Sequence, residues 1–448
     1  MTRLAALAIG LCLAILPAFA GSPLLVTVGE VTDTRAVVWV RGFEESPVTV
    51  EYAPASSRRQ SSLSVAVTPN VDLTGKVSLT RLRPATRYTY RVRQGGESVE
   101  GGFVTAPAPN QSPPVTFLWS GDLGGGRRCR GIQDGYPIFR PMARLKPDFF
   151  LFVGDTIYAD VRCGGPDWVP GYDFVATTLE EYREKHRYNR SDPGVQDFFR
   201  TTSVYAIWDD HEVKNDFAGP SEPLMPVGRQ AFLDYWPIQP PPDEQTRLYR
   251  KVRWGRLLEV FILDTRQYRS PNQDPDGPGK TMLGPAQRRW LIDSVSTSGA
   301  TWKVVVSSVP LSVPTGRGSA RDSWSNANRL GFPEENATGF AVERDLILRS
   351  LRDRKVKNLV WLVADVHHAE VIRHRPWPRF TFYEFIAGPL AASQGRPRPL
   401  DMELNPLSLF GVGEIDNFGA VTVDQRGLSV QIIDVADRVR FSHTIAPD

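Results

Sequence analysis

Acidic residues and histidines follow directly after several apolar segments of this sequence, and these residue types bind metal ions. The segments are residues 115–119, 149–153, 204–208 and 359–363, and the residues that follow them include Asp122, Asp155, Asp210 with His211, and Asp365 with His367. A single Gly-Asp pair would be weak evidence, because both residues are common in turns. Four such loops in order predict that the polar side chains meet in one site.

The chemistry that these residue types support is metal-dependent displacement at phosphorus. Carboxylate oxygens and imidazole nitrogens suit divalent or trivalent metal ions. Two such ions can clamp the attacking and the leaving oxygen of a phosphoryl displacement, and a bridging carboxylate is needed between them. We therefore expect a two-metal centre at the ends of these segments.

The residues around the candidate ligands indicate how the backbone could present them. Gly121 and Gly154 would let the chain turn sharply before the aspartate that follows each of them. Asp365 and His367 are two positions apart, and side chains at this spacing face the same way in extended backbone. On this argument His367 is the expected ligand and His368 faces elsewhere.

Strands and helices must bring these loops together. Helical patterns lie between the apolar segments at residues 136–145, 179–188, 285–295 and 342–352. Strands that alternate with helices predict a layered α/β domain, and such sheets place their ligands at the carboxyl ends of the strands. The tail has hairpin texture at 420–423 and 428–432, and we expect it to complete a sheet of this domain.

A β-rich module precedes this domain in the prediction. Short alternating strands between residues 24 and 105 indicate a small β-sandwich, and residues 79–92 resemble the fibronectin type III pattern. The Pro-rich run 106–115 can be neither helix nor central strand, so it is predicted to be a linker. The expected organisation is a signal peptide at 1–20, the sandwich at 21–107 and the site-bearing domain at 115–448.

Charge and the N-terminal segment narrow the possible partners and the location. The 448 residues include 53 basic and 50 acidic side chains, and the arginines are scattered, so no specific nucleic-acid partner is indicated. Arg3, the apolar run 4–16 and the small residues Ala18 and Ala20 predict a cleaved signal peptide. That run is shorter than the ~20 residues needed to cross a bilayer. We expect a secreted or periplasmic protein, monomeric and without a stable membrane anchor.

Removal of the signal peptide would take Cys12 away and leave two cysteines, Cys129 and Cys163. In an oxidising compartment we expect these two to form a disulfide. Two unpaired buried thiols or a metal-binding role remain the alternatives, because the sequence does not fix the distance between them.

Several motifs, taken together and in order, resemble the PhoD-like alkaline phosphatase family of the calcineurin-like metallophosphoesterase superfamily. They are Gly-Asp-Thr-Ile-Tyr-Ala-Asp at 154–160, Trp-Asp-Asp-His-Glu at 208–212 with Asn215, Leu-Asp-Thr-Arg at 263–266, Leu-Gly-Pro-Ala-Gln at 283–287, and Ala-Asp-Val-His at 364–367. The resemblance covers roughly residues 115–370. It implies a four-layered α/β/β/α sandwich preceded by the small β-sandwich, and a centre that carries iron together with calcium.

The resemblance also implies roles for individual residues. The first ion would be held by Asp122, Tyr158 and His367, Asp155 would bridge, the second ion would be held or approached by Asp210, Asn215 and Asp365, and His211 would contact the phosphate. Family members often have a cysteine where this chain has Asp122, which makes the first site harder and its preference for iron weaker. They are usually exported by a twin-arginine signal, whereas this chain has the single Arg3.

The expected activity is hydrolysis of small-molecule phosphate esters by a secreted enzyme of the alkaline phosphatase D type. One alternative is a phosphodiesterase or phospholipase D-like activity of the same centre, and another is a non-catalytic, metal-loaded protein that binds a surface. Tyr158 has an alternative reading as a core aromatic residue. Arg266 and Arg269 would either meet substrate phosphate or form structural ion pairs.

Overall fold

The computed structural model describes residues 24–125, 128–317 and 320–448. The predicted signal peptide at residues 1–20 lies outside these ranges. Within them, no helix is long and apolar enough to cross a membrane.

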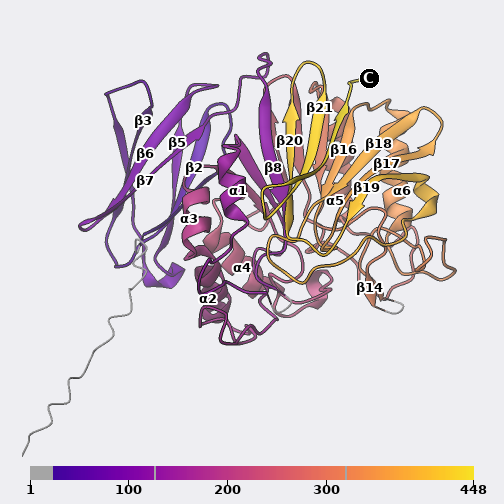
Figure 1. Ribbon diagram of the computed structural model, residues 1–448, viewed down its shortest axis with the longest axis horizontal. Helices are drawn as coiled ribbons and strands as arrows, with labels where there is room; N and C mark the ends of the chain where they lie inside the picture. Colours follow the sequence, from indigo (N-terminus) through magenta and orange to yellow (C-terminus); the bar gives the residue numbers. More distant parts are fainter. Residues whose placement is uncertain (1–23, 126–127, 318–319) are drawn as a thin grey trace, which may run out of the picture.

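Two large β-sheets form the centre of the protein (Figure 1). In spatial order, the described strands of the first sheet are β22 (Val439–Ile445), β21 (Leu428–Asp434), β20 (Asn417–Val423), β8 (Val115–Ser120), β9 (Phe149–Val153), β10 (Ser203–Ile207), β1 (Leu25–Gly29), β2 (Arg35–Arg41) and β5 (Thr74–Thr80). Those of the second sheet are β11 (Arg250–Trp254), β12 (Leu258–Ile262), β13 (Trp302–Val306), β16 (Leu359–Val363), β18 (Phe380–Ile386), β17 (Ala369–Trp377) and β19 (Pro406–Val412). The predicted C-terminal hairpin is β20 and β21, and β20 pairs antiparallel with β8, so the tail completes the first sheet as expected.

The two sheets are packed face to face through large apolar side chains. Phe149 of β9 lies with its ring centroid 4.7 Å from that of Trp254 in the second sheet. Successive side chains of a strand point to opposite faces, so the next residue, Phe150, packs outward against Phe198 at 5.6 Å. This is why β9 is apolar at every position and lacks the polar alternation of a strand with one wet face.

Helices cover the outer faces of both sheets. Their described bounds are α1 (Phe139–Arg144), α2 (Leu179–Arg190), α3 (Pro193–Phe199), α4 (Met225–Tyr235), α5 (Gly284–Thr297) and α6 (Ala341–Asp353). Helices α1 and α3 pack on the first sheet, while α5 and α6 share an apolar cluster with β12, β13 and β16 of the second. The predicted α/β/β/α arrangement is confirmed.

Local sequence signals set the start of the helices that flank the predicted site loops. Thr178 and Glu181 cap the start of α2 reciprocally: the Glu181 N–H donates to the Thr178 hydroxyl at 3.3 Å, and the Thr178 N–H donates to Glu181 Oε2 at 2.9 Å. The Asp192 carboxylate accepts from the N–H of Val195, and Pro193 opens α3 with a backbone angle already suited to a helix.

A smaller sheet lies at the N-terminal end of the molecule, where the strands are coloured indigo and purple in Figure 1. Its described strands are β4 (Ser61–Val65), β3 (Val48–Pro54), β6 (Arg87–Gln94) and β7 (Glu97–Val104). Valines of β1, β2 and β5 form one apolar cluster with residues of β3, β6 and β7, so these strands build the expected β-sandwich.

One face of this sandwich is continuous with the first large sheet. Strand β1 pairs in parallel with β10 at Gly29 and Val204, which joins the sandwich to the strands that precede the site. The contact is reinforced by an ion pair of Arg250 with Glu30 at 2.6 Å. Trp39 of β2 packs on Tyr235 of α4, with ring centroids 5.5 Å apart. The sandwich is therefore fixed against the larger unit, although the sequence suggested a linker between them.

Short elements complete the described chain. They are the 3-10 helices η1 (Pro69–Val71), η2 (Gly219–Ser221) and η3 (Met402–Leu404), and the two-residue strands β14 (Gly316–Arg317) and β15 (Ala320–Arg321). Strands β14 and β15 pair within the long connection between β13 and α6, which runs over the same end of the molecule as the predicted site loops (Figure 1).

Candidate metal centre

The predicted ligands come from loops at one end of the two sheets. Strands β8, β9 and β10 are parallel neighbours, so the loops after them, which carry Asp122, Asp155 and Asp210, leave the first sheet at the same edge. Strand β16 lies in the opposing sheet and leads to Asp365 and His367. The face-to-face packing of the sheets brings both sets of loops together.

The backbone at the predicted ligands is unusual. Asp122, Asp155, Asp365 and His367 have φ angles of 64°, 50°, 65° and 58°, in the left-handed region that residues other than glycine seldom adopt. Such conformations persist where the surrounding structure enforces them, and they cluster at functional sites. Four of them at the ends of three strands indicate that these loops are shaped to direct side chains.

The two glycines before the aspartates act in different ways. Gly154 has φ 84°, and a Cβ there would lie 2.5 Å from the Cβ of Asp209, so its turn requires glycine as the sequence suggested. At Gly121 the reason is close packing, since a Cβ would lie 2.7 Å from that of Ala364.

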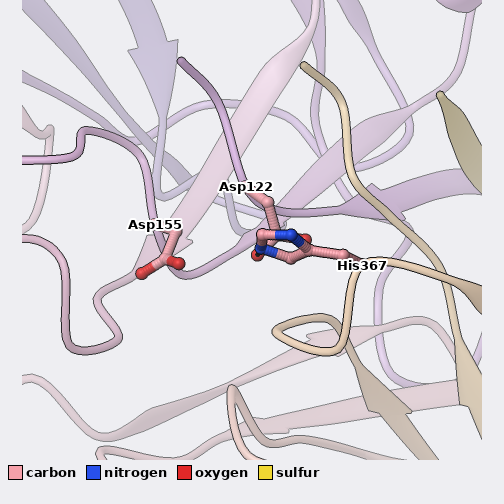
Figure 2. A group of neighbouring side chains, drawn as sticks. All are labelled: Asp122, Asp155 and His367. Carbon is pink, nitrogen blue, oxygen red and sulfur yellow. Dashed lines mark ion pairs between the residues drawn. The ribbon is translucent and has the colours of Figure 1, made fainter. Parts of the chain in front are cut away.

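Five side chains form two overlapping groups of potential metal ligands. The first group is Asp122, Asp155 and His367, the second is Asp155, Asp210 and His211, and within each group the candidate ligand atoms all lie within 4.8 Å of one another. Figure 2 shows the imidazole of His367 over the carboxylate of Asp122, with Asp155 beside them. The Nε2 of His367 is 3.9 Å from Oδ1 of Asp122. Asp155 belongs to both groups, which is the position a bridging carboxylate requires.

The oxygens of this cluster fit bound cations. Among the described residues, neither carboxylate oxygen of Asp122 has a hydrogen-bond partner, and the same is true of Oδ1 of Asp210 and Oδ2 of Asp365. Buried polar atoms are rarely left unpaired, because each unsatisfied one destabilises the fold by ~1–3 kcal/mol. Four orphaned carboxylate oxygens that converge in one place are the arrangement expected of a site built for hard cations.

The pKa values of the carboxyl groups in this cluster also indicate a site for cations. Burial, together with the charge of Asp209, raises the pKa of Asp122 well above its ordinary value, and burial with the charge of Asp210 does the same for Asp155. Burial and Asp209 likewise raise the pKa of Asp365. Asp210 differs: burial would raise its pKa, but Arg266 and His211 outweigh burial and lower it. Crowded buried carboxylates must hold protons or cations, because they repel one another at low dielectric.

Tyr158 and His367 share a hydrogen bond on the Asp122 side of the cluster. The Tyr158 hydroxyl lies 3.0 Å from Nε2 of His367, and Nδ1 of that imidazole lies 2.9 Å from the hydroxyl of Ser393. Burial and His211 lower the pKa of His367 to about 4, so the ring is neutral and Nε2 is free to act as a ligand atom. Each of these two groups would offer one ligand atom to an ion on this side of the cluster.

His211 is held by two contacts. Its Nδ1 donates to Oδ1 of Asp160 at 2.6 Å, and its ring packs on that of Tyr158 with centroids 4.2 Å apart and the planes tilted by 31°. Burial lowers the pKa of His211, but Asp210 and Asp160 outweigh burial and raise it to about 9. The imidazole therefore carries a proton at neutral pH, with Nδ1 turned to Asp160 and Nε2 left for the site.

Two predicted ligands take more peripheral positions. Asp365 belongs to none of the ligand groups found among the described residues, although the charges of Asp209 and Asp210 affect its pKa. Asn215 is exposed, and its backbone N–H donates to Oδ2 of Asp160 at 2.9 Å.

His368 turns away from the cluster, with Nε2 3.3 Å from Glu370. The choice of His367 rested on extended backbone, but residues 364–368 form a bend in which Asp365 and His367 are left-handed. The expected orientation is therefore present for a different reason from the one expected.

A buried ion-pair network supports the cluster from behind. Arg266 is fully buried, donates to Asp209 at 2.6 Å, and binds both oxygens of Asp322 at 2.8 Å. Arg269 contacts the same Asp322 at 2.6 Å. Both arginines thus form buried structural ion pairs, although Nη2 of Arg269 has no hydrogen-bond partner among the described residues. Glu212 also ties two loops together, since it accepts from the N–H groups of Thr156 and Asp209.

Some residues of the site were missed by sequence reasoning. Asp216 and Asp322 form a third acidic group with Asp210, and burial with the charge of Asp322 raises the pKa of Asp216 to about 6. Ser393 and Gly388 come from the loop after β18, where a Cβ on Gly388 would lie 2.5 Å from Oδ2 of Asp122. Asp216 is next to Asn215 in the acidic loop after β10, whereas Asp322, Ser393 and Gly388 follow no apolar segment with an acidic motif, so no local signal marked those three.

A disulfide joins two of the loops around the site. Cys129 and Cys163 are bonded, with Cα atoms 6.2 Å apart. Lys185 of α2 donates to the carbonyl oxygens of Val161 and Tyr172 on either side of Cys163. The loop that carries Tyr158 and Asp160 is thus fixed at several points.

The fold of this chain is similar to that of two solved phosphatase structures. A solved structure of PhoD has a TM-score of 0.77 at 22% identity and covers 96% of this chain and 94% of its own. The purple acid phosphatase PPD1 from yellow lupin (Lupinus luteus) seeds has a TM-score of 0.66 at 14% identity and covers 94% of this chain and 74% of its own. At these identities the likeness shows the fold alone, which this chain shares with both phosphatase structures.

The sequence identifies the family. The profile of the PhoD-like phosphatase family matches residues 127–438, and that of the PhoD-like phosphatase N-terminal domain matches residues 21–107. The chain belongs to the PhoD-like phosphatase family. Alkaline phosphatase D of Bacillus subtilis (strain 168) is 28% identical over 319 residues, which cover 64% of this chain and 52% of that protein. The chain thus spans about half the length of this relative, and the predicted membership of a family of phosphoric ester hydrolases is confirmed.

Removal of metal should destabilise the protein, and more so as the pH rises. A carboxyl group with a raised pKa binds its proton more tightly in the fold than in the unfolded chain. The stability that this proton contributes is lost as the pH rises from 3.8 through the raised value. Bound cations would replace these protons. We expect the melting temperature after chelation to fall as the pH rises from about 5 to 8, while that of the metal-loaded protein changes less.

The quantity to measure is the difference in melting temperature between the metal-loaded and the chelated protein at each pH. The buried Lys185, whose pKa burial lowers to about 7, contributes stability in the opposite direction but is common to both forms. A melting-temperature difference that is constant over this pH range would contradict the assignment of the cluster as a cation site.

Proposed function

We propose that this protein hydrolyses phosphate esters as an enzyme of the alkaline phosphatase D type, with monoesters as the first substrate class and diesters as the second. The observation that carries the proposal is the place of Asp155 in both ligand groups, because phosphoryl displacement by two ions needs one shared carboxylate. The family membership of residues 127–438 supports the same reaction.

The described residues fit two metal ions, which we assign as iron together with calcium. Asp122, Tyr158 and His367 would hold one ion and Asp210 the other, with Asp155 between them and Asn215 and Asp365 as further ligands of the second. When bound, such ions would activate water and neutralise the oxygens of the phosphoryl group. Asp122 supplies oxygen where a cysteine is frequent in the family, so the first site is harder and its preference for iron is weaker than in members with the cysteine.

His211 would donate a proton to the departing alkoxide. Its Nδ1 is engaged by Asp160, so the proton on Nε2 is the one directed to the site. The tilted contact with the Tyr158 ring also restricts the orientation of the imidazole. A positioned acid with these contacts lowers the barrier most for an alcohol that leaves poorly as an anion.

Replacing Asp155 should weaken both metal sites, whereas replacing a residue that would bind one ion should weaken only that site. Asp155→Asn keeps a side-chain oxygen that can accept from the backbone N–H of His211, as Asp155 does at 3.2 Å. It removes the charge that both ions would share. We expect Asp155→Asn to lose at least about a thousandfold in kcat and to bind less of both metals, because the loss corresponds to several kcal/mol of transition-state stabilisation. Asp365→Asn should mainly weaken one ion.

The measurements are bound metal per chain, circular dichroism, and turnover of 4-nitrophenyl phosphate and bis(4-nitrophenyl) phosphate. Retention of two ions and near wild-type turnover by a folded Asp155→Asn protein would sink the proposed centre. The two substrates also decide which ester class is preferred.

The role of His211 predicts a dependence on the leaving group. We expect His211→Asn to lose about a hundredfold or more in kcat on an alkyl phosphate, but less than about tenfold on 4-nitrophenyl phosphate, whose leaving group needs no proton. His443→Asn, on the distant strand β22, is the matched control and should change neither rate. Equal losses on both esters would show that His211 only binds phosphate.

We also propose export from the cytoplasm, with cleavage after Ala20. The charged and apolar pattern of residues 1–20 and the disulfide of Cys129 with Cys163 support this location. N-terminal sequencing of the protein recovered outside the cytoplasm should therefore begin at Gly21. A recovered chain that still carries residues 4–16 would refute the cleavage.

A further inference from the structure

A cavity of about 640 Å³ opens beside His211, on the side of its hydrogen-bond partner Asp160. His211 and Asp160 form its wall toward the metal centre. The apolar residues that line it are Val161, Val175, Ala176, Val213 and Leu224. A concave, mostly apolar space that ends on a few fixed polar groups is the usual form of a ligand site.

The walls of this cavity are held in place by hydrogen bonds to the site itself. The N–H of Ala159 donates to the carbonyl oxygen of His211 at 2.8 Å, and the N–H of Ala176 donates to that of Ala159, also at 2.8 Å. Lys185 holds the carbonyl of Val161 at 2.8 Å. The distance from the apolar wall to the His211 ring is therefore set by the backbone, and the cavity is preformed.

Apolar surface at the mouth of the cavity is left open to solvent. Val175 is 39% exposed, although it stands beside a buried cluster that contains Ala159 and Ala176. Leu224 packs on the same cluster and turns its remaining surface to the cavity. Exposed apolar side chains at the rim of a site mark a surface that a ligand can cover.

We propose that this cavity receives the alcohol part of the substrate and that the enzyme prefers phosphate esters of apolar alcohols. The inference rests on the proposed function, because His211 and Asn215 line the cavity and lie in the loop that carries Asp210. When the P–O bond to the alcohol breaks, the oxygen of water joins phosphorus, and the alkoxide gains in the balance the proton that this water loses. A carbon chain on the alkoxide oxygen that runs past His211 meets the apolar wall of the cavity.

Charge in the cavity agrees with a neutral alcohol. The Asp160 carboxylate lies in the wall and repels an anionic group. Lys214 stands at the rim with its side chain 62% exposed and 3.9 Å from Glu222, so it is solvated and already beside an acid.

The test uses the metal-loaded protein and a series of esters that differ in chain length alone. Methyl, butyl and hexyl phosphate release alcohols of nearly equal basicity, so their intrinsic reactivity is similar while their apolar area grows. Each buried CH₂ strengthens binding by up to about fourfold. We expect kcat/KM to rise at least about tenfold from methyl to hexyl phosphate. If only the diester bis(4-nitrophenyl) phosphate is hydrolysed, the dialkyl esters replace the monoesters.

A matched pair of variants locates the effect. Val175→Asn makes the mouth of the cavity polar, and we expect the hexyl-to-methyl ratio of kcat/KM to fall about fivefold. Val342→Asn is the control, since Val342 is 40% exposed on α6, outside the cavity, and it should keep the wild-type ratio.

The outcomes separate this inference from the function on which it rests. If neither 4-nitrophenyl ester is hydrolysed, the proposed function fails. Suppose that one of them is hydrolysed but kcat/KM does not rise from methyl to hexyl phosphate, or is higher for glycerol phosphate than for hexyl phosphate. The proposed function then holds, and the apolar cavity is refuted as the alcohol site. Equal ratios in the two variants would refute it as well.

Discussion

The constraint on which this structure depends is the repulsion among carboxylates buried at one point. Asp122, Asp155, Asp209, Asp210 and Asp365 come from the loops after four strands, and burial raises the pKa of all of them except Asp210. Bringing such groups together at low dielectric is unfavourable unless protons, cations or arginines compensate. The fold supplies one compensation itself, since Arg266 binds Asp209 and Asp322, and it leaves the oxygens that face the centre unpaired.

The fold satisfies this constraint by separating rigid support from ligand atoms. The apolar strands β8, β9, β10 and β16 are buried on both faces, so the points at which their loops begin cannot shift. The ligands then stand on short bends with left-handed residues. Glu212 and the disulfide of Cys129 with Cys163 link one loop to the next. Such support keeps potential ligands at fixed distances before an ion or a substrate binds.

The sandwich module is part of the same support. Its strand β1 extends the sheet that carries Asp155 and Asp210, and Trp39 packs on α4, which follows the loop of His211. Helix α2, next to α4, supplies Lys185 to the cavity wall. The path from the sandwich to the site therefore runs through helices that also shape the cavity beside His211.

Much of the site was readable from the sequence because metal chemistry restricts the residue types and because parallel strands end at a common edge. The positions of the strands that lead to the site followed from apolar runs, although α3, α4 and strands β17 to β19 were not predicted. The family followed from motifs in order. The Pro-rich run 106–115 suggested a linker, and local composition gave no indication that β1 would pair with β10. The sequence also could not reveal Asp322, Ser393 or Gly388, since each reaches the site from an irregular segment far along the chain. Their positions depend on how the two sheets face each other, as does the bend that directs His367, and these were decided by the tertiary structure alone. Residue types and their order are local properties of the chain, whereas distances among loops of opposing sheets arise only when the core has packed.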